Sequence, residues 1–215
     1  YKDVTETRNP DRFIKVAERG ADLDLEGEDF QAFVALLKER NIVVDPTVAI
    51  FFDLFVQEPG QPAPSSAAIH DRLPAQVARG ALSGGLPIPP DQKARYAASA
   101  QRLLDVVAAL HRAGVPLVAG TDALSGFALH AELEFYVRAG IPPADVLRLA
   151  TIGAATVMDA TADAGAIEPG LRADLVLVDG RPDERMSDIR AVSWVKKSGA
   201  VYEPAAIYRE IGVQP

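Results

Sequence analysis

Few side chains in this sequence combine a reactive group with a position that could present it to a substrate. Asp122 is the strongest candidate, because it follows the short apolar run 115–119 and the turn residues Gly120 and Thr121. A run of this length after Gly114 predicts a buried parallel strand rather than a helix. In barrel enzymes the catalytic groups lie at the C-terminal ends of such strands. Asp122 is therefore a candidate for proton transfer, with capping of the following helix as the alternative.

Four other side chains could contact a substrate near this carboxylate. His130 opens the helix predicted after the loop, so we expect it to face the same end of the strand and to bind substrate or orient another group. Thr47 is a polar candidate at the end of the strand predicted over 42–44. Phe51 and Phe52 follow that strand, and they either form an apolar wall for the substrate or belong to the core.

Two acidic residues close to His130 do not form a catalytic pair. Glu132 and Glu134 lie two positions apart on the predicted helix and cannot share a face, so we expect each to form a salt bridge. The sequence has three histidines and no cysteine, which excludes disulfides and thiolate ligands. Any metal would have to be bound by His, Asp, Glu or a modified Lys.

The composition limits the class of protein and its partners. With 215 residues, 48% of them hydrophobic and 24% charged, the chain can bury a sizeable core. Its net charge of -8 lacks the positive field that nucleic acids require. No apolar run is long enough to cross a bilayer, so we expect no membrane contact and a cytoplasmic location. The first residue is Tyr1 rather than Met, which leaves a removed leader as an open alternative.

The elements that must position these side chains alternate between strands and helices. Such alternation predicts an α/β fold with a parallel sheet and helices outside it. The first helix is predicted from apolar residues at i, i+3, i+4 and i+7, and it ends near Asn41: Phe30, Phe33, Val34 and Leu37. The further helices are predicted over 92–113, over 128–139 and from Pro142 onward.

A long segment, 56–90, is rich in Pro, Gly, Ser and Ala and contains at most a short helix over 75–82. Connections of this length in compact domains are usually functional lids or disordered linkers. We favour a lid, because we expect the segment to connect a strand to the helix over 92–113, which makes it a βα loop.

The hydrophobic period changes after about residue 165. Turn signals then separate three predicted strands, which form a small β module: 174–180, 192–196 and 200–202. We therefore predict two parts, residues 1–164 and residues 165–215.

Taken together, several short motifs closely resemble the C-terminal part of the amidohydrolase superfamily, in the branch with imidazolonepropionase-like and prolidase-like enzymes. Each motif alone is a weak signal, but their combination in this order is specific. The motifs are Ala119-Gly120-Thr121-Asp122, His130-Ala131-Glu132-Leu133, the stretch 139–147, Ala150-Thr151, Gly165 to Gly170 with its Glu-Pro-Gly, and Ala173 to Gly180 with its Ala-Asp-Leu-Val.

This resemblance implies a (β/α)8 TIM-type barrel with a small β-sandwich built from both ends of the chain. It also implies one or two divalent metal ions, zinc being the expected one, at the mouth of the barrel. Asp122 would then end the eighth strand, bind the metal and accept a proton from the attacking water. The implied activity is hydrolysis of a carbon–nitrogen bond in a small molecule, such as a cyclic amide or a dipeptide-like compound.

The sequence also departs from the family pattern. The His-x-His pair of the first strand, the Lys or Glu of the fourth, and the histidines of the fifth and sixth are not found in it. A complete barrel takes roughly 250 residues. By the resemblance, the chain begins after the sixth strand and is a C-terminal fragment or one part of a larger assembly.

Three interpretations therefore stay open from the sequence. The parent protein is a metal-dependent hydrolase, and this chain carries its C-terminal half. Alternatively, the chain is a catalytically silent fragment or metal-free scaffold that pairs with the missing N-terminal half or with itself, because one carboxylate cannot satisfy a divalent cation. In the third interpretation, Asp122 acts without a metal in another class of barrel enzyme.

Overall fold

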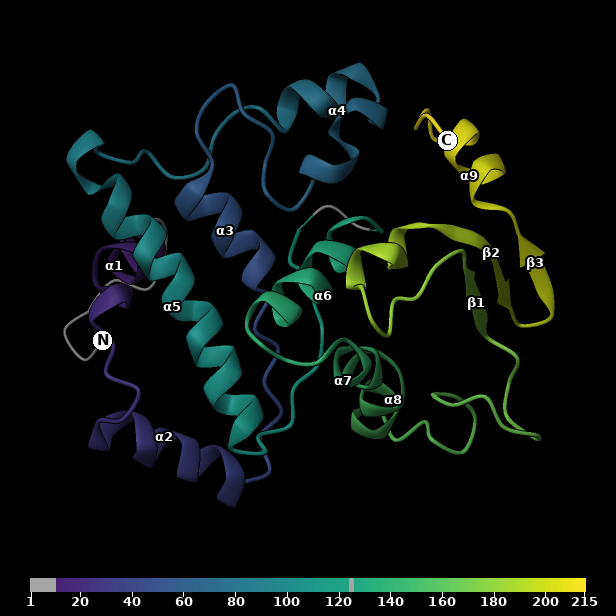
Figure 1. Ribbon diagram of the computed structural model, residues 1–215, viewed down its shortest axis with the longest axis horizontal. Helices are drawn as coiled ribbons and strands as arrows, with labels where there is room; N and C mark the ends of the chain where they lie inside the picture. The colour runs from purple at the N-terminus through teal and green to yellow at the C-terminus, as the bar shows by residue number, and fades with distance from the viewer. Residues whose placement is uncertain (1–10, 124–125) are drawn as a thin grey trace.

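Helix α5 (Lys93–Arg112), with 20 residues, is the longest helix of the described residues and runs through the left half of the molecule in Figure 1. The computed structural model describes residues 11–123 and 126–215. One face of α5 is buried against α1 (Asp11–Arg19), α3 (Val48–Val56) and α6 (Ala128–Arg138). The buried side chains recur every three or four positions, which is the period of an α-helix. They include Tyr96, Ala100, Leu104 and Val107.

The other elements of the described residues are short. The helices are α2 (Glu28–Glu39), α4 (Ala75–Gly80), α7 (Pro143–Arg148), α8 (Ala154–Val157) and α9 (Pro204–Glu210). Shorter helical turns are η1 (Gly20–Asp22), η2 (Ala67–Arg72), η3 (Pro90–Gln92), η4 (Leu149–Gly153) and η5 (Met186–Arg190), and η4 is a π-helical turn.

Most helices form where the hydrophobic spacing predicts them. The first predicted helix corresponds to α2, and the residue after its end, Asn41, has a φ of 49° as a left-handed C-terminal residue should. The helix predicted over 128–139 corresponds to α6, for which the spacing predicts one apolar face with Leu129, Leu133, Tyr136 and Val137; of these, Leu133 and Tyr136 are buried. The prediction is wrong for Leu129, which is 38% exposed.

The two predicted parallel strands pair over a very short length. Val44 and Leu117 form a single parallel bridge, in which the Val44 N–H donates to Pro116 O at 2.9 Å and the Val118 N–H donates to Val44 O at 3.1 Å. The parallel direction agrees with the sequence. Two backbone hydrogen bonds are a minimal pair, so other contacts must hold these segments in register.

The segment 56–90 does not directly follow a strand, which corrects the sequence-based prediction. Helix α3 lies between the parallel pair and this segment, and α4 takes the place of the short predicted helix. Polar side chains fasten the segment to α3. The Asp53 carboxylate accepts the Ser65 N–H at 2.8 Å and the Ser65 hydroxyl at 2.5 Å. Gln57 donates to the carbonyls of Gln61 and Ala81. The segment is thus ordered by specific contacts rather than acting as a linker.

The β module consists of β1 (Leu175–Val178), β2 (Val192–Lys197) and β3 (Ala200–Tyr202) in one antiparallel sheet of that order. Ser198 and Gly199 both have positive φ and form the predicted turn between β2 and β3. The sheet exposes several large apolar side chains, among them Val176, Leu177, Val201 and Tyr202. The described residues contain one such sheet, so a second layer of a β-sandwich is not seen within them.

The helical part and the region after residue 165 share a core. Met186 of η5 is 3% exposed and belongs to the same buried cluster as Leu104, Leu133 and Tyr136. The division at residues 164 and 165 stays a prediction. Within the described ranges, no helix has both the length and the apolar character needed to cross a membrane.

Candidate functional site

Asp122 lies on the loop after the parallel pair, and its side chain is exposed. Its φ of 45° falls in the left-handed region, which Asp adopts more readily than most residues. It is not the N-cap residue of α6, since that residue is Phe127, five positions later. The capping interpretation of Asp122 is therefore wrong, and its carboxylate is presented to solvent.

The loop that carries Asp122 is fixed to the first segment of the parallel pair by Asp45. One oxygen of the Asp45 carboxylate accepts the Gly120 N–H at 2.8 Å. The other oxygen leaves no space for a side chain at residue 120, because a Cβ there would lie 2.1 Å from it. Gly120 is thus required by the close approach of this carboxylate rather than by its φ angle.

Thr47 immediately precedes α3 as its N-cap residue. It is half-buried, has a φ of 46° and does not cap the helix with its side chain. The N-terminus of α3 is capped instead by a carboxylate from α6. Glu132 accepts the Val48 N–H at 2.9 Å with one oxygen and the Ala49 N–H at 2.7 Å with the other. These are amides of the first helical turn, where a negative charge is favourable.

Glu132 is fully buried, at 0% exposure. Burial raises the pKa of its carboxyl group to about 7, while the two backbone bonds and a hydrogen bond from Tyr136 oppose the rise. The expected salt bridge for Glu132 is wrong, because its partners are backbone amides and a phenol. The salt bridge expected for Glu134 is confirmed, with Arg190 at 2.8 and 3.0 Å.

His130 is half-buried in the first turn of α6. Burial lowers its pKa, the nearby charge of Arg190 lowers it further, and Glu134 partly offsets both. The imidazole is therefore neutral near pH 7, with one nitrogen able to donate and the other able to accept. A substrate contact by His130 stays a prediction.

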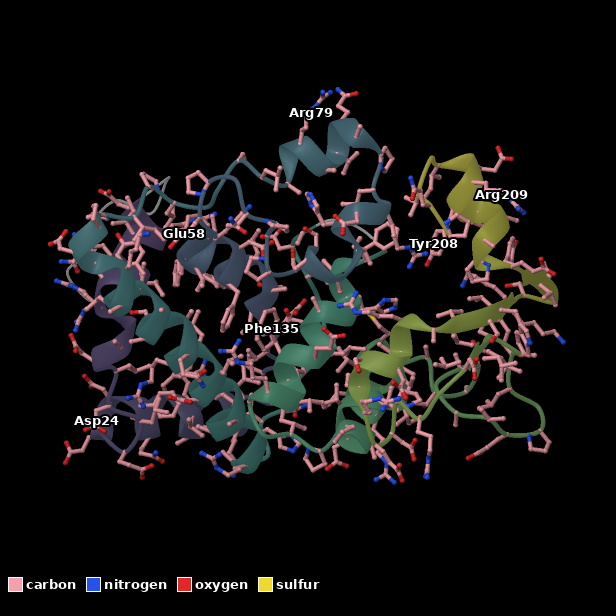
Figure 2. The ribbon with its side chains drawn as sticks, turned by 45° about the horizontal axis from the view of Figure 1, so that its top comes forward. Asp24, Glu58, Arg79, Phe135, Tyr208 and Arg209 are labelled. Atoms are coloured by element: carbon pink, nitrogen blue, oxygen red, sulfur yellow. The ribbon has the colours of Figure 1, made fainter. Side chains whose placement is uncertain are left out.

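The two phenylalanines predicted near the substrate lie in the hydrophobic core. Phe52 is 4% exposed and stacks on Phe135 with ring centroids 4.3 Å apart, and Phe51 packs edge-on against Phe55 at 5.6 Å. Figure 2 shows Phe135 in the interior of the molecule. Phe52 also lines a groove of about 430 Å³ between α3, α5 and α6. A wall for the substrate stays a prediction for both phenylalanines.

The middle of the segment 56–90 is held against α9 and the residues that follow it. The Arg72 guanidinium donates to Gln214 O at 2.7 Å, and the Gln214 N–H donates to Arg72 O at 2.8 Å. Tyr208 contacts both Arg72 and Phe127, with the guanidinium 5.2 Å from its ring centroid and the Phe127 ring centroid 5.9 Å away. Since Phe127 begins the helix after the Asp122 loop, α9 contacts both the long segment and the edge of the candidate site.

The described residues do not form a complete metal site. No three side chains of His, Asp or Glu among residues 11–123 and 126–215 lie together in a way that could hold an ion. Asp122 supplies one carboxylate, whereas a zinc ion in a protein takes four ligands. A metal at Asp122 would therefore need ligands from outside residues 11–123 and 126–215.

Parallel pairing with helices outside it, and a carboxylate on the loop that follows, are typical of barrel hydrolases. The comparisons with known proteins agree with this class. The model of the amidohydrolase family matches residues 34–204, and the chain belongs to this family. The membership inferred from the motifs is thereby confirmed. No curated protein matches the chain in sequence.

Solved structures of related fold include prolidase-like and other amidohydrolase enzymes. A Xaa-Pro dipeptidase with bound methionine is 22% identical over 86% of this chain, with a TM-score of 0.55. The A. niger ochratoxinase is 21% identical over 82% with a TM-score of 0.56, and bottromycin amidohydrolase is 24% identical over 80% with a TM-score of 0.57. The chain spans 39%, 35% and 41% of these three structures, respectively.

Proposed function

We propose that the protein containing this chain hydrolyses an amide bond in a small molecule, with Asp122 as the residue that transfers the proton. The observation that carries the proposal is the exposed carboxylate of Asp122 on the loop directly after the parallel pair of Val44 and Leu117. Family membership supports the amide bond as the target. A dipeptide-like compound or a cyclic amide is the substrate class that the resemblance favours.

The proposed reaction uses Asp122 twice. Its carboxylate accepts a proton from water as the water oxygen forms a bond to the amide carbon. The protonated carboxyl then donates that proton to the amide nitrogen as the carbon–nitrogen bond breaks, which leaves a carboxylic acid and an amine. Thr47 and neutral His130 are the proposed hydrogen-bonding groups for the substrate, and Phe51 and Phe52 are proposed as an apolar wall beside it.

Members of the family generally depend on a divalent metal, and we propose zinc for this protein. Asp122 is the ligand this chain would supply. We propose that the remaining ligands come from outside the described residues, which hold no group of side chains that fits an ion. We also propose that the chain supplies the last part of a barrel and part of a β-sandwich.

The test compares two matched variants of the full-length protein, Asp122→Asn and Asp159→Asn. Both residues are exposed aspartates with positive φ, at 45° and 53°. The substrate panel is Met-Pro, N-acetylmethionine and dihydrouracil, with products detected by mass spectrometry. We expect hydrolysis of at least one compound, a decrease in kcat of about 10²- to 10⁴-fold for Asp122→Asn, and no change for Asp159→Asn.

Two results would contradict the proposal: no hydrolysis of any panel compound, or an Asp122→Asn variant as active as the wild type. Chelation tests the metal separately. Activity that survives exhaustive chelation would favour the interpretation in which Asp122 acts without a metal.

A second candidate is a partner-dependent scaffold. The apolar side chains exposed on β1 and β3 favour it, since such a surface promotes association. Size-exclusion chromatography of residues 1–215 tests it: dimers or larger species support the scaffold, and a monomer with a sharp thermal transition contradicts it.

A further inference from the structure

Helix α6 holds the ends of both segments of the parallel pair through two side chains one turn apart. Glu132 binds the Val48 and Ala49 amides, which follow the first segment. The Tyr136 hydroxyl donates to Val118 O, in the second segment, at 2.7 Å. Both side chains are at 0% exposure.

The two side chains also interact with each other. Tyr136 forms a hydrogen bond with Glu132, and its phenol has only one proton. The hydroxyl can therefore donate to only one acceptor at a time, the Val118 carbonyl or the Glu132 carboxylate. The contact to one segment is thereby coupled to the contact to the other.

The parallel pair needs such support. Its own backbone bonds are the two between Val44 and the 116–118 stretch, and a pair this short is marginal without further packing. Asp45 adds one bond to Gly120 at the solvent side, where the Asp45 carboxylate is exposed. Glu132 and Tyr136 act from the opposite, buried side, where water does not compete for their hydrogen bonds.

We propose that Glu132 and Tyr136 are positioning residues of the candidate site: by holding Val48, Ala49 and Val118, they fix the backbone from which Thr47 and Asp122 project. This inference rests on the proposed function for its effect on activity. The coupling of α6 to the two segments does not depend on any substrate, because it consists of hydrogen bonds within the protein. Neither residue contacts the reacting atoms.

The test uses two conservative variants with a matched control for each. Tyr136→Phe removes the hydroxyl and keeps the ring, and its control is Tyr96→Phe on α5, a tyrosine at 2% exposure. Glu132→Gln removes the charge and one backbone acceptor. Its control is Glu134→Gln on the same helix, which loses the ion pair with Arg190.

Amide hydrogen exchange of the full-length protein, followed by mass spectrometry of peptides, is the first readout. In Tyr136→Phe and Glu132→Gln we expect peptides covering 44–50 and 117–123 to exchange about five- to tenfold faster, as the loss of one buried hydrogen bond implies. Peptides of β2 and β3 report global stability and should not change. Both controls should match the wild type at 44–50 and 117–123.

The second readout is kinetic, on whichever panel compound the wild type hydrolyses. We expect kcat to fall about tenfold in Tyr136→Phe with KM within about twofold, because a misplaced Asp122 affects the transition state more than substrate binding. Wild-type kcat in Tyr136→Phe would contradict the proposal. So would unchanged exchange at 44–50 and 117–123, or equal acceleration in every peptide. If no panel compound is hydrolysed, that result contradicts the proposed function but not the coupling of α6 to the two segments. Hydrogen exchange at 44–50 and 117–123 then tests the coupling without any substrate.

Discussion

The carboxylate of Asp45 lies against the backbone of Gly120, 75 residues later in the chain, and occupies the space that a side chain there would need. One carboxylate oxygen accepts the Gly120 N–H. The other lies 2.1 Å from the position that a Cβ at residue 120 would take. The contact joins the ends of the two segments on the solvent-facing side of the parallel pair. It therefore fixes the start of the loop that carries Asp122.

A methyl group at residue 120 should disrupt this contact. In Gly120→Ala the Asp45 carboxylate must turn away, and the residue 120 N–H loses its acceptor. We expect unfolding by urea to show a loss of about 1–2 kcal/mol. The double variant Asp45→Ala, Gly120→Ala should be no less stable than Gly120→Ala alone, because the two changes remove the same interaction.

Gly80 is the matched control for this substitution. A Cβ at Gly80 would meet nothing within 4 Å, its φ is not positive, and it ends α4. Gly80→Ala should be neutral or slightly stabilising. A Gly120→Ala protein as stable as Gly80→Ala would show that the carboxylate does not constrain the loop.

Burial of Glu132 gives the protein a stability that depends on pH. The pKa of this carboxyl is raised from an ordinary value of 4.5 to about 7. Between these values the folded state keeps the proton while the unfolded state has released it. Stability from this group is therefore complete below pH 4.5 and is lost as the pH rises to 7, by about 3 kcal/mol in total.

Urea unfolding of the wild type and Glu132→Gln at pH 5, 6, 7 and 8 measures this contribution. The wild type should lose stability relative to the variant as the pH rises from 5 to 7, and the difference should level off above pH 7. Asp53 also has a pKa raised by burial, but it is present in both proteins and cancels in the difference. Parallel curves for the two proteins would mean that Glu132 does not titrate in this range.

Hydrophobic spacing predicted the elements with a clear polar face. Helices α2, α5 and α6 and the three strands of the β module form where the sequence indicates. Helix α3 was missed because the run 48–56 is apolar on nearly every side, so it shows no helical period. That omission made the segment 56–90 look like a direct βα loop.

The candidate site was predictable only in part. Asp122 stands out because its strand and loop are contiguous in sequence. The contacts of Glu132 join residues 83 and 84 positions apart, and no local pattern encodes them. One signal was present: Ala128, Glu132 and Tyr136 are spaced by four and share the buried face of α6, which marks Glu132 as a buried carboxylate in need of partners.

The contact between α9 and the segment 56–90 should keep that segment in place beside the candidate site. Arg72 is bound to Gln214 and covered by Tyr208, next to a small cluster of Ile69, Leu73 and Val213. In Tyr208→Ala the ring that contacts Arg72 and Phe127 is lost. We expect trypsin to cleave the 67–80 region at least about fivefold faster, because local opening there costs less free energy.

Arg209 provides the control, since it is the neighbouring residue on α9, is exposed and points away from Tyr208 (Figure 2). Arg209→Ala also removes a trypsin site without touching the cluster, so cleavage at 67–80 should proceed at the wild-type rate. Global unfolding is checked by the thermal transition of each variant. If Tyr208→Ala is cleaved at 67–80 no faster than Arg209→Ala, then the Tyr208 ring has no part in ordering the segment.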